Sequence, residues 1–360
     1  MMLKRITTAV WVAALVLGGA AACGGDDDDD DAQDDGQDDD TGTTPDAGDT
    51  TPDAGDTTPD AGATDLCPDL AYDEEGFIDV PGGRVWYGIY GTGDKTPILT
   101  VHGGPGVPHY YFLPFMKELA DAEGRPVIFY DQLGSGRSDR VTDTSLYNVD
   151  RYIEELGDVV AGLGLKEFHL WGHSWGTQLG LLYAATQPAG LRSLILASPI
   201  IDIPTYRQDL FGLLAEEPQE VQDGINNNEP GSKAYVAALN EFYADHLVTI
   251  DPFPDCWNKA FSAEQFGVDS YSAMIGTDEL NYTGVLMTRD DSGALDDVQA
   301  PIWFNCGGAD LAIPERCEQY SSQVPGSVSN IFPGSSHAYF DEERPAYLTA
   351  FQDFLAGVEK

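Results

Sequence analysis

Basic residues are scarce in this sequence. Lysine and arginine together number 18, against 61 aspartates and glutamates, and the 360-residue chain has a formal net charge of −43 at pH 7. Proteins that bind nucleic acids neutralise phosphates with lysine and arginine, so this composition argues against nucleic acid as a partner. The same negative field attracts cationic substrates and keeps the protein soluble.

Motifs for metals and nucleotide cofactors are also lacking. None of the cysteine and histidine spacings is typical of a zinc site. Neither a phosphate-binding P-loop nor a dinucleotide-binding fingerprint occurs. We therefore expect no metal and no organic cofactor.

The longest apolar stretch, residues 6–22, is short for a bilayer span. It follows Lys4 and Arg5 and ends in small residues, which predicts a secretory signal peptide over residues 1–22. Cys23 comes directly after three alanines, as at a bacterial lipoprotein cleavage site, where Cys23 would become the lipidated first residue. The alternative is ordinary signal cleavage nearby, with Cys23 removed or left free. We expect an exported protein of the bacterial cell envelope, anchored by lipid to a membrane.

Residues 23–65 form a segment of low complexity. Seventeen aspartates lie in residues 26–65, and the hexapeptide Thr-Thr-Pro-Asp-Ala-Gly recurs with a period of seven. Dense like charge with little hydrophobicity cannot form a packed core, so the segment is predicted to be a disordered and extended tether.

Four cysteines follow the tether. An even number in an exported chain indicates two disulfides, with three connectivities open. We expect one bond to join the start of the folded domain to an inserted cap and the other to close a short loop. The pairs are Cys67 with Cys256 and Cys306 with Cys317.

Residues 172–176 read Gly-His-Ser-Trp-Gly, between a predicted strand over residues 167–171 and a predicted helix over residues 177–185. A G-x-S-x-G turn between a strand and a helix presents a strained, exposed serine as a nucleophile. The pattern therefore predicts that Ser174 is the nucleophile of a hydrolase.

A second glycine-rich loop follows the predicted strand over residues 96–101. Residues 102–106 read His-Gly-Gly-Pro-Gly and stand where an oxyanion-binding loop is expected. Two backbone N–H groups stabilise the negative oxygen of a tetrahedral intermediate. The expected donors are the amides of Gly104 and of Trp175.

An acid and a base follow in the required order. Asp310 comes in a turn after a strand-like run at residues 301–306, and His337 follows another at residues 327–333. In this arrangement the histidine would take the proton from Ser174 and the aspartate would orient the imidazole.

Strand and helix patterns alternate from residue 97 to residue 198, which predicts a mostly parallel sheet flanked by helices. The alternation breaks at Pro199 and resumes at Ala300. We expect residues 66–360 to form one domain, with a helical cap inserted at about residues 202–297 that controls access to the active site.

Three blocks together resemble the prolyl aminopeptidases, or proline iminopeptidases, of the α/β-hydrolase superfamily. They are residues 102–106, residues 131–138 (Asp-Gln-Leu-Gly-Ser-Gly-Arg-Ser) and residues 172–177, and the resemblance extends over residues 75–358. It implies an α/β-hydrolase fold and a serine hydrolase. By position it implies Ser174, Asp310 and His337 as the catalytic triad and Gly104 and Trp175 as the oxyanion donors.

Carboxylates hold the amino group of the substrate in this family, and the resemblance implies that Glu279 is one of them. The chain departs from the family at two positions. Leu133 stands where arginine is usual, and Leu311 follows the expected catalytic acid where some members have glutamate.

We expect an aminopeptidase that releases an N-terminal residue, preferably proline, from short peptides or related amides through an acyl-enzyme. One alternative, favoured by Leu311, is an esterase or amidase for small uncharged substrates. Another is a non-catalytic surface-binding module built on a hydrolase scaffold. A substrate without a free amine separates the first two, and labelling by a fluorophosphonate tests the third.

Overall fold

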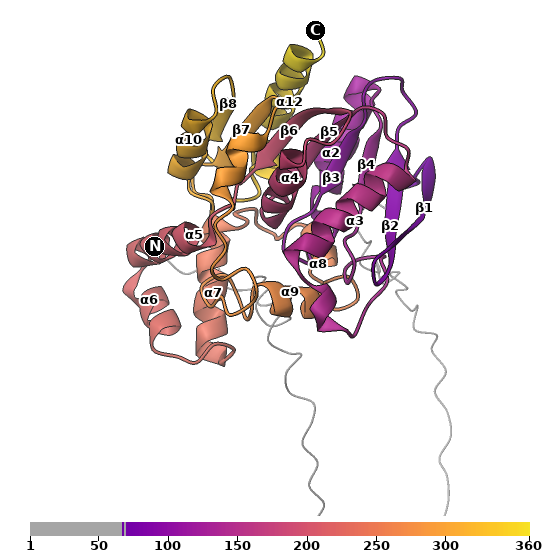
Figure 1. Ribbon diagram of the computed structural model, residues 1–360. Coiled ribbons are helices and arrows are strands. Elements are labelled where there is room, and N and C mark those ends of the chain that lie inside the picture. The colour runs from indigo at the N-terminus through magenta and orange to yellow at the C-terminus, as the bar shows by residue number, and fades with distance from the viewer. Residues whose placement is uncertain (1–66, 68–69) are drawn as a thin grey trace, which may run out of the picture.

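The computed structural model describes residue 67 and residues 70–360. Its centre is an eight-stranded sheet with the order β1-β2-β4-β3-β5-β6-β7-β8 (Figure 1). β1 and β2 form an antiparallel hairpin, β2 pairs antiparallel with β4, and all other pairs are parallel. The strands are β1 Glu74–Val80, β2 Gly83–Tyr90, β3 Ile98–Val101, β4 Val127–Tyr130, β5 Phe168–His173, β6 Leu191–Ala197, β7 Ile302–Gly307 and β8 Val328–Phe332.

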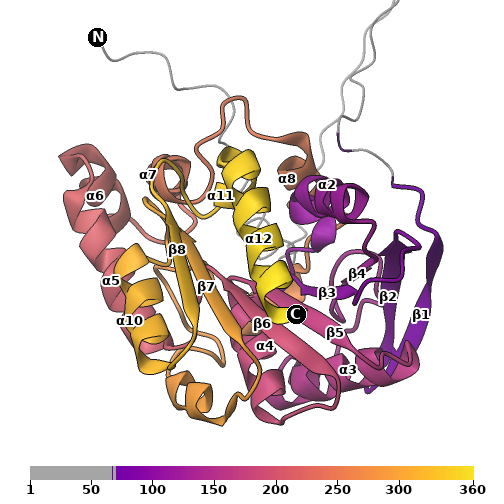
Figure 2. The same cartoon turned by 90° about the horizontal axis from the view of Figure 1, so that it is seen from above.

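Helices cover both faces of the sheet. α2 and α12 lie together on one face, and α3 and α4 lie together on the other (Figures 1 and 2). The helices that follow strands are α2 Leu113–Glu123, α3 Val149–Gly162, α4 Trp175–Ala185, α10 Pro314–Gln323, α11 Tyr339–Glu342 and α12 Arg344–Val358. Short 3₁₀ turns are η3 His109–Phe112, η4 Thr144–Leu146 and η5 Ser292–Asp297.

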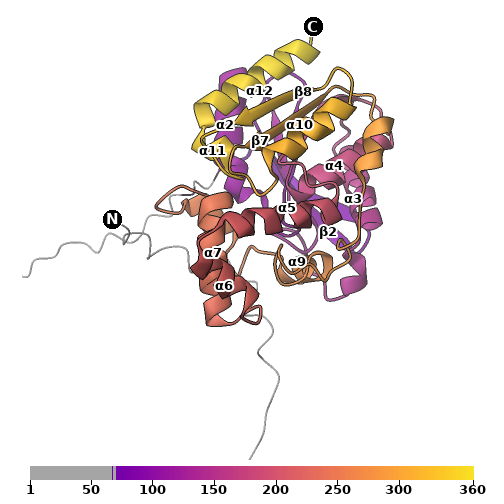
Figure 3. The same cartoon turned by 90° about the vertical axis from the view of Figure 1, so that its left-hand side faces the viewer.

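Five helices occupy the interval between β6 and β7, beyond the carboxyl ends of the parallel strands (Figure 3). They are α5 Ile203–Glu216, α6 Gln219–Asn226, α7 Lys233–His246, α8 Asp255–Ala260 and α9 Val268–Met274. We call residues 203–274 the cap. The predicted fold class, a mostly parallel sheet flanked by helices with an inserted helical cap, is confirmed.

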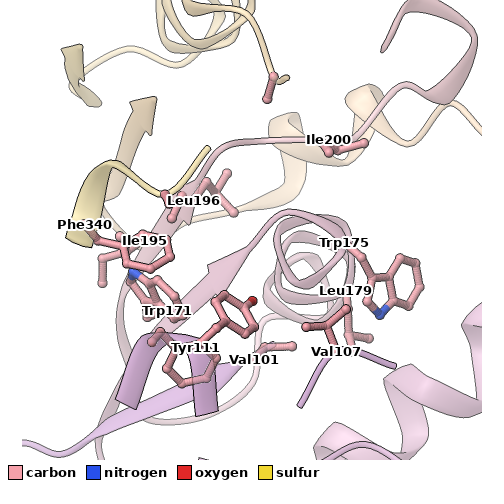
Figure 4. Close-up of a cluster of buried hydrophobic side chains, with 14 of the residues drawn as sticks. Val101, Val107, Tyr111, Trp171, Trp175, Leu179, Ile195, Leu196, Ile200 and Phe340 are labelled. Atoms are coloured by element: carbon pink, nitrogen blue, oxygen red, sulfur yellow. The ribbon is translucent and has the colours of Figure 1, made fainter. Parts of the chain in front are cut away.

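The central parallel strands are buried on both faces, as helices on both sides of a parallel sheet require. Every residue of β3, β5 and β7 is buried. Figure 4 shows how Val101, Trp171 and Leu196, from three neighbouring strands, pack beside Leu179 of α4 and Phe340 of α11. Trp171 also donates a hydrogen bond of 2.9 Å from its indole to the Tyr347 hydroxyl on α12. The segment that presents Ser174 is therefore held in rigid packing.

Both predicted disulfides are present. Cys67 bonds to Cys256 on α8 of the cap, and Cys306 at the end of β7 bonds to Cys317 on α10. The signal peptide, Cys23 and the tether lie outside the described residues. Of the helices in residues 70–360, none is both long and apolar enough to cross a membrane.

Candidate active site

Ser174 occupies the turn between β5 and α4 in a strained conformation, with φ 56° and ψ −124°. The two flanking glycines make this turn sterically feasible. A Cβ atom at Gly172 would lie 2.2 Å from the carbonyl oxygen of Gly176, and one at Gly176 would lie 2.2 Å from that of Val101. No other residue fits at either position, so the motif presents the serine above the sheet.

The loop after β3 approaches the serine through its backbone. A Cβ atom at Gly103 would lie 3.0 Å from that of Ser174, and the Gly103 amide donates to the Tyr111 hydroxyl at 2.9 Å. Gly104 has φ 108°, and its amide donates to no group in the described part of the chain. The amide of Trp175, at the first turn of α4, is equally free of an acceptor among those residues. Two N–H groups therefore remain available beside Ser174.

The predicted acid and base lie side by side. His337 Nδ1 lies 2.6 Å from Asp310 Oδ1, and both side chains are buried. Asp310 also accepts hydrogen bonds from the Ala312 amide at 2.8 Å and from the Ser198 hydroxyl at 2.6 Å. His337 Nε2 is left to face the cavity that Ser174 also lines.

The sequence analysis did not identify Ser198 as a residue of the site. Ser198 follows the last residue of β6 and has φ 55°, and its amide donates to the Asn305 carbonyl at 2.7 Å. Serine at the end of a strand is common and gives no signal by itself. Its role as a partner of Asp310 depends on β6 and β7 being neighbours in the sheet.

Three other histidines are structural. His102, the first residue of the glycine-rich loop at residues 102–106, is buried, and burial lowers its pKa to about 4. His173, directly before Ser174, bonds to the Tyr111 hydroxyl and to the His337 carbonyl, and burial holds its pKa well below the usual value. His169 is buried in β5, where burial lowers its pKa to about 4. These histidines support the loops and the core of the sheet.

The block at residues 131–138 anchors the cap. Asp131 is buried and accepts from His109 Nδ1 at 2.8 Å and from the Arg137 amide at 2.9 Å. The Gly136 amide donates to the Gln265 carbonyl at 2.8 Å. Nearby, the Arg140 guanidinium bonds to four carbonyl oxygens, three of them in residues 264–266.

The departure at Leu133 has a structural counterpart. The buried Leu133 amide faces the carboxylate of Glu155, which is fully buried. Arg151, one turn earlier on α3, bonds to Glu155 at 2.5 Å. A cation from α3 thus pairs with the buried carboxylate that faces the Leu133 amide.

A cavity of about 680 Å³, measured to its open mouth, lies between the sheet and the cap. Ser174 and His337 line it together with Gly104, Leu311 and Glu279. The rest of its wall is largely aromatic and comes mainly from the cap: Tyr111, Tyr206, Tyr243, Trp257, Phe261, Phe266 and Tyr271.

Glu279 points a carboxylate into this aromatic cavity. It is half-buried and accepts hydrogen bonds from the Tyr271 hydroxyl at 2.7 Å and from the Tyr243 hydroxyl. Burial and then the Glu279 charge raise the pKa of both tyrosines well above the usual value, so both remain neutral donors. The neighbouring Asp278 is buried and bonded to Tyr235 and Asn281, and burial followed by the Glu279 charge raises its pKa to about 6.

The structure brings Ser174, His337, Gly104 and Glu279 onto one cavity, with Asp310 behind the histidine and Trp175 beside the serine. Among the described residues, no three side chains of histidine, cysteine, aspartate and glutamate gather closely enough to hold a metal ion.

A parallel sheet that presents a strained serine below a helical cap defines a class, the serine hydrolases of the α/β type. A family model described as the alpha/beta hydrolase fold matches residues 96–343. The chain belongs to this family, and within it to the serine hydrolases of the prolyl aminopeptidase type.

Proteins of similar sequence and structure support the assignment to the prolyl aminopeptidase type. The proline iminopeptidase of Heyndrickxia coagulans is 38% identical over 289 residues, which cover 79% of this chain and 99% of that protein. The crystal structure of proline iminopeptidase from Mycobacterium smegmatis has a TM-score of 0.73 at 27% identity, covering 79% of this chain and 98% of that one. The crystal structure of VinJ has a TM-score of 0.75 at 30% identity, covering 80% and 100%.

Proposed function

We propose that this protein releases an N-terminal residue, preferably proline, from short peptides or related amides through an acyl-enzyme. The observation that carries the proposal is the carboxylate of Glu279, held by two tyrosines in the cavity that Ser174 and His337 also line. A free N-terminus is a cation, and a carboxylate in a partly desolvated pocket attracts it more strongly than one in water. The relatives named proline iminopeptidase support the same conclusion.

The chemistry follows the order of the groups around Ser174. The serine Oγ attacks the substrate carbonyl and passes its proton to His337 Nε2, while Asp310 stabilises the imidazolium through Nδ1. The amides of Gly104 and Trp175 bind the negative oxygen, and a donor of this kind contributes about 3–4 kcal/mol to lowering the barrier. His337 then gives the proton to the leaving amine, and water hydrolyses the ester formed on Ser174.

The first test compares proline 4-nitroanilide with its N-acetylated form, on purified enzyme with intact disulfides and with Ser174→Ala as the blank. We expect a strong preference for the free amine because acetylation removes the charge that Glu279 binds. Equal rates on both anilides would overturn the aminopeptidase assignment.

A second candidate is an esterase or amidase for small uncharged substrates. Leu311, 2% exposed, places an aliphatic side chain on the cavity wall beside Asp310. This candidate predicts cleavage of 4-nitrophenyl esters with no advantage for a free amine. A protein that turns over neither substrate and takes no fluorophosphonate label on Ser174 would instead be a binding module.

We also propose that the enzyme is exported and anchored through a lipid on Cys23. The sequence of residues 1–23 and the two disulfides support this, because disulfides persist in oxidising compartments outside the cytosol. In a bacterial host that processes lipoproteins, wild-type protein should incorporate labelled fatty acid and sediment with membranes. Cys23→Ser should incorporate none and stay in the supernatant, and membrane association that survives the substitution would contradict the anchor.

A further inference from the structure

Tyr111, in the 3₁₀ turn η3, contacts both the glycine-rich loop and the turn that carries Ser174. Its hydroxyl oxygen accepts a hydrogen bond from the Gly103 amide at 2.9 Å and lies 2.9 Å from His173 Nδ1. The side chain is buried and packs against Trp257 of the cap, with ring centroids 4.7 Å apart. No step of the reaction at Ser174 uses this hydroxyl directly.

The direction of each hydrogen bond in this contact follows from the histidine. His173 Nε2 lies 3.2 Å from the carbonyl oxygen of His337, which can only accept, so Nε2 carries the proton. Burial holds the pKa of His173 well below the usual value, so the ring is neutral and Nδ1 has a free lone pair. The Tyr111 hydroxyl therefore donates to Nδ1 while its oxygen accepts from Gly103. One chain of hydrogen bonds thus runs from Gly103 to the backbone of His337.

The carbonyl of Gly103 is held as firmly as its amide. It accepts from His102 Nδ1 at 2.9 Å and from the Val107 amide at 3.3 Å. A trans peptide is planar, and its carbonyl and its N–H point in opposite directions. The Gly104 amide belongs to the same peptide as the Gly103 carbonyl. The contacts on Gly103 therefore set the direction in which the Gly104 N–H points.

The position of Gly103 matters because it lies directly against the nucleophile. A Cβ atom at Gly103 would lie 3.0 Å from that of Ser174 and 3.2 Å from the Tyr111 hydroxyl oxygen. Without this hydroxyl, the Gly103 N–H and His173 Nδ1 would both be buried without a partner. Buried polar groups without partners cost free energy, which a shift of the loop would relieve. Such a shift would turn the Gly104 N–H away from the oxygen of the tetrahedral intermediate.

We infer that Tyr111 is a positioning residue for the oxyanion donor at Gly104. The inference rests on the proposed role of that amide and is independent of the preference for proline. The hydroxyl holds the glycine-rich loop through Gly103 and connects it, through His173, to the backbone of His337. The oxyanion donor, the nucleophile and the base thereby keep their places relative to one another.

The substitution Tyr111→Phe tests this role because it removes the hydroxyl and keeps the ring. Complete loss of one oxyanion donor lowers kcat about 100- to 1,000-fold, and a donor that is only misdirected should cost less. We expect kcat/KM for 4-nitrophenyl acetate and for proline 4-nitroanilide to fall by the same factor, about tenfold. Both substrates pass through an oxyanion intermediate, so both should be affected. Rates are expressed per active site titrated with a fluorophosphonate, which excludes unfolded protein.

An inhibitor isolates the oxyanion contact from general damage to the fold. Phenylboronic acid adds the Ser174 Oγ to boron and forms a tetrahedral adduct, which places an oxygen where the oxyanion would lie. In Tyr111→Phe its inhibition constant should rise by about the factor by which kcat/KM falls, because analogues of the transition state report transition-state binding. A purely structural role would lower the amount of active enzyme and leave the inhibition constant unchanged.

Tyr347→Phe is the matched control. Tyr347 on α12 is also fully buried, and its hydroxyl accepts from the Trp171 indole at 2.9 Å, but it does not line the cavity. Urea unfolding should show a similar loss of stability in the two variants. In Tyr347→Phe, kcat/KM and the inhibition constant should stay within about twofold of wild type.

An unchanged inhibition constant in Tyr111→Phe would overturn the inference, as would equal losses of kcat/KM in the two variants. A loss confined to the anilide would also overturn it, since it would place Tyr111 in substrate binding. A wild-type enzyme that hydrolyses the acetate but not the anilide would refute the proposed aminopeptidase function alone. The acetate and the boronic acid would then still test the role of Tyr111.

Discussion

Under the proposed function, Glu279 is the residue whose charge separates cleavage of peptides with a free amine from cleavage of neutral esters. Two tyrosine hydroxyls hold its carboxylate, yet each oxygen keeps a lone pair for a substrate ammonium group. Tyr271 comes from α9 and Tyr243 from α7, so two cap helices place one carboxylate beside the nucleophile.

The substitution Glu279→Gln should lower kcat/KM for proline 4-nitroanilide about 10- to 100-fold, since a hydrogen bond to a charged group contributes about 1.5–3 kcal/mol. Turnover of 4-nitrophenyl acetate should be nearly unchanged because that substrate has no charge to lose. Asp278→Asn is the matched control, with a smaller effect expected because Asp278 is already bonded to Tyr235 and Asn281. A loss on both substrates alike would show a purely structural role for Glu279.

At the scale of elements, α7 connects the cap to the loops of the acid and the base. His246, the last residue of α7, bonds through Nδ1 to the Ala309 carbonyl at 2.9 Å, next to Asp310. Its carbonyl accepts from the His337 amide at 3.0 Å. Its Nε2 pairs with Glu217 after α5 at 3.0 Å. One residue thus holds both loops against the cap.

Removing the imidazole with His246→Ala should lower kcat roughly fivefold, the value of about one hydrogen bond. Glu217→Gln is the control, because it weakens the contact with α5 and keeps the bond to Ala309, so kcat should fall less. Steady-state measurement of kcat and KM for both variants tests this. If Glu217→Gln lowers kcat as much as His246→Ala, the bond to Ala309 has no part in the effect.

Glu359, which follows the last residue of α12, holds the end of this helix in place through an ion pair and hydrogen bonds. Glu359 binds the buried Arg125 with both oxygens, at 2.6 and 2.8 Å, and also His169 at 3.1 Å. The hydrogen bond from Arg125 lowers the pKa of Glu359 to about 2. An acid whose pKa is lower in the folded state stabilises the fold above its unfolded pKa, and this stability is lost as pH falls toward 2.

Glu359→Gln should therefore lower the free energy of unfolding at pH 7 by about 1–2 kcal/mol, a value reduced by solvent screening of a partly exposed group. The difference from wild type should shrink as pH falls from about 4.5 toward 2. Urea unfolding at pH 7 and at pH 3 measures both values. A difference of equal size at the two pH values would rule out the charge as its cause.

At the scale of the whole molecule, the Cys67–Cys256 bond joins the start of the described domain to the cap across 189 residues. Cys256 lies on α8 next to Trp257, which lines the cavity beside the nucleophile. The bond therefore restrains both the unfolded chain and one wall of the active site.

Replacing this pair by serine should cost about 5 kcal/mol of stability on the loop-entropy account, against about 3 kcal/mol for the 11-residue loop of Cys306–Cys317. Urea unfolding of the two double variants compares them directly. Replacing Cys67 and Cys256 should also raise KM, because α8 loses its covalent link to the start of the domain. The opposite order of stabilities would show that native packing, and not loop length, decides the effect.

Much of this architecture could be predicted from local patterns. Short segments of sequence predict the alternation of strands and helices and the turn that carries Ser174, because steric limits and hydrophobic periodicity act over a few residues. The chain order of Ser174, Asp310 and His337 can be read directly from the sequence. The two disulfide pairs were also predicted, although pairing is a long-range property with three alternatives.

Only the tertiary structure decided which groups meet. Ser198 contacts Asp310 because β6 and β7 are neighbours, and Glu279 meets its two tyrosines because α7 and α9 cross the same cavity. Tyr111 joins the glycine-rich loop to the end of β5 because β3 and β5 are neighbours. The sequence by itself determined the local motifs, because each of them is formed by residues close together in the chain. Which side chains meet was decided by the tertiary structure, because those contacts join residues far apart in the chain.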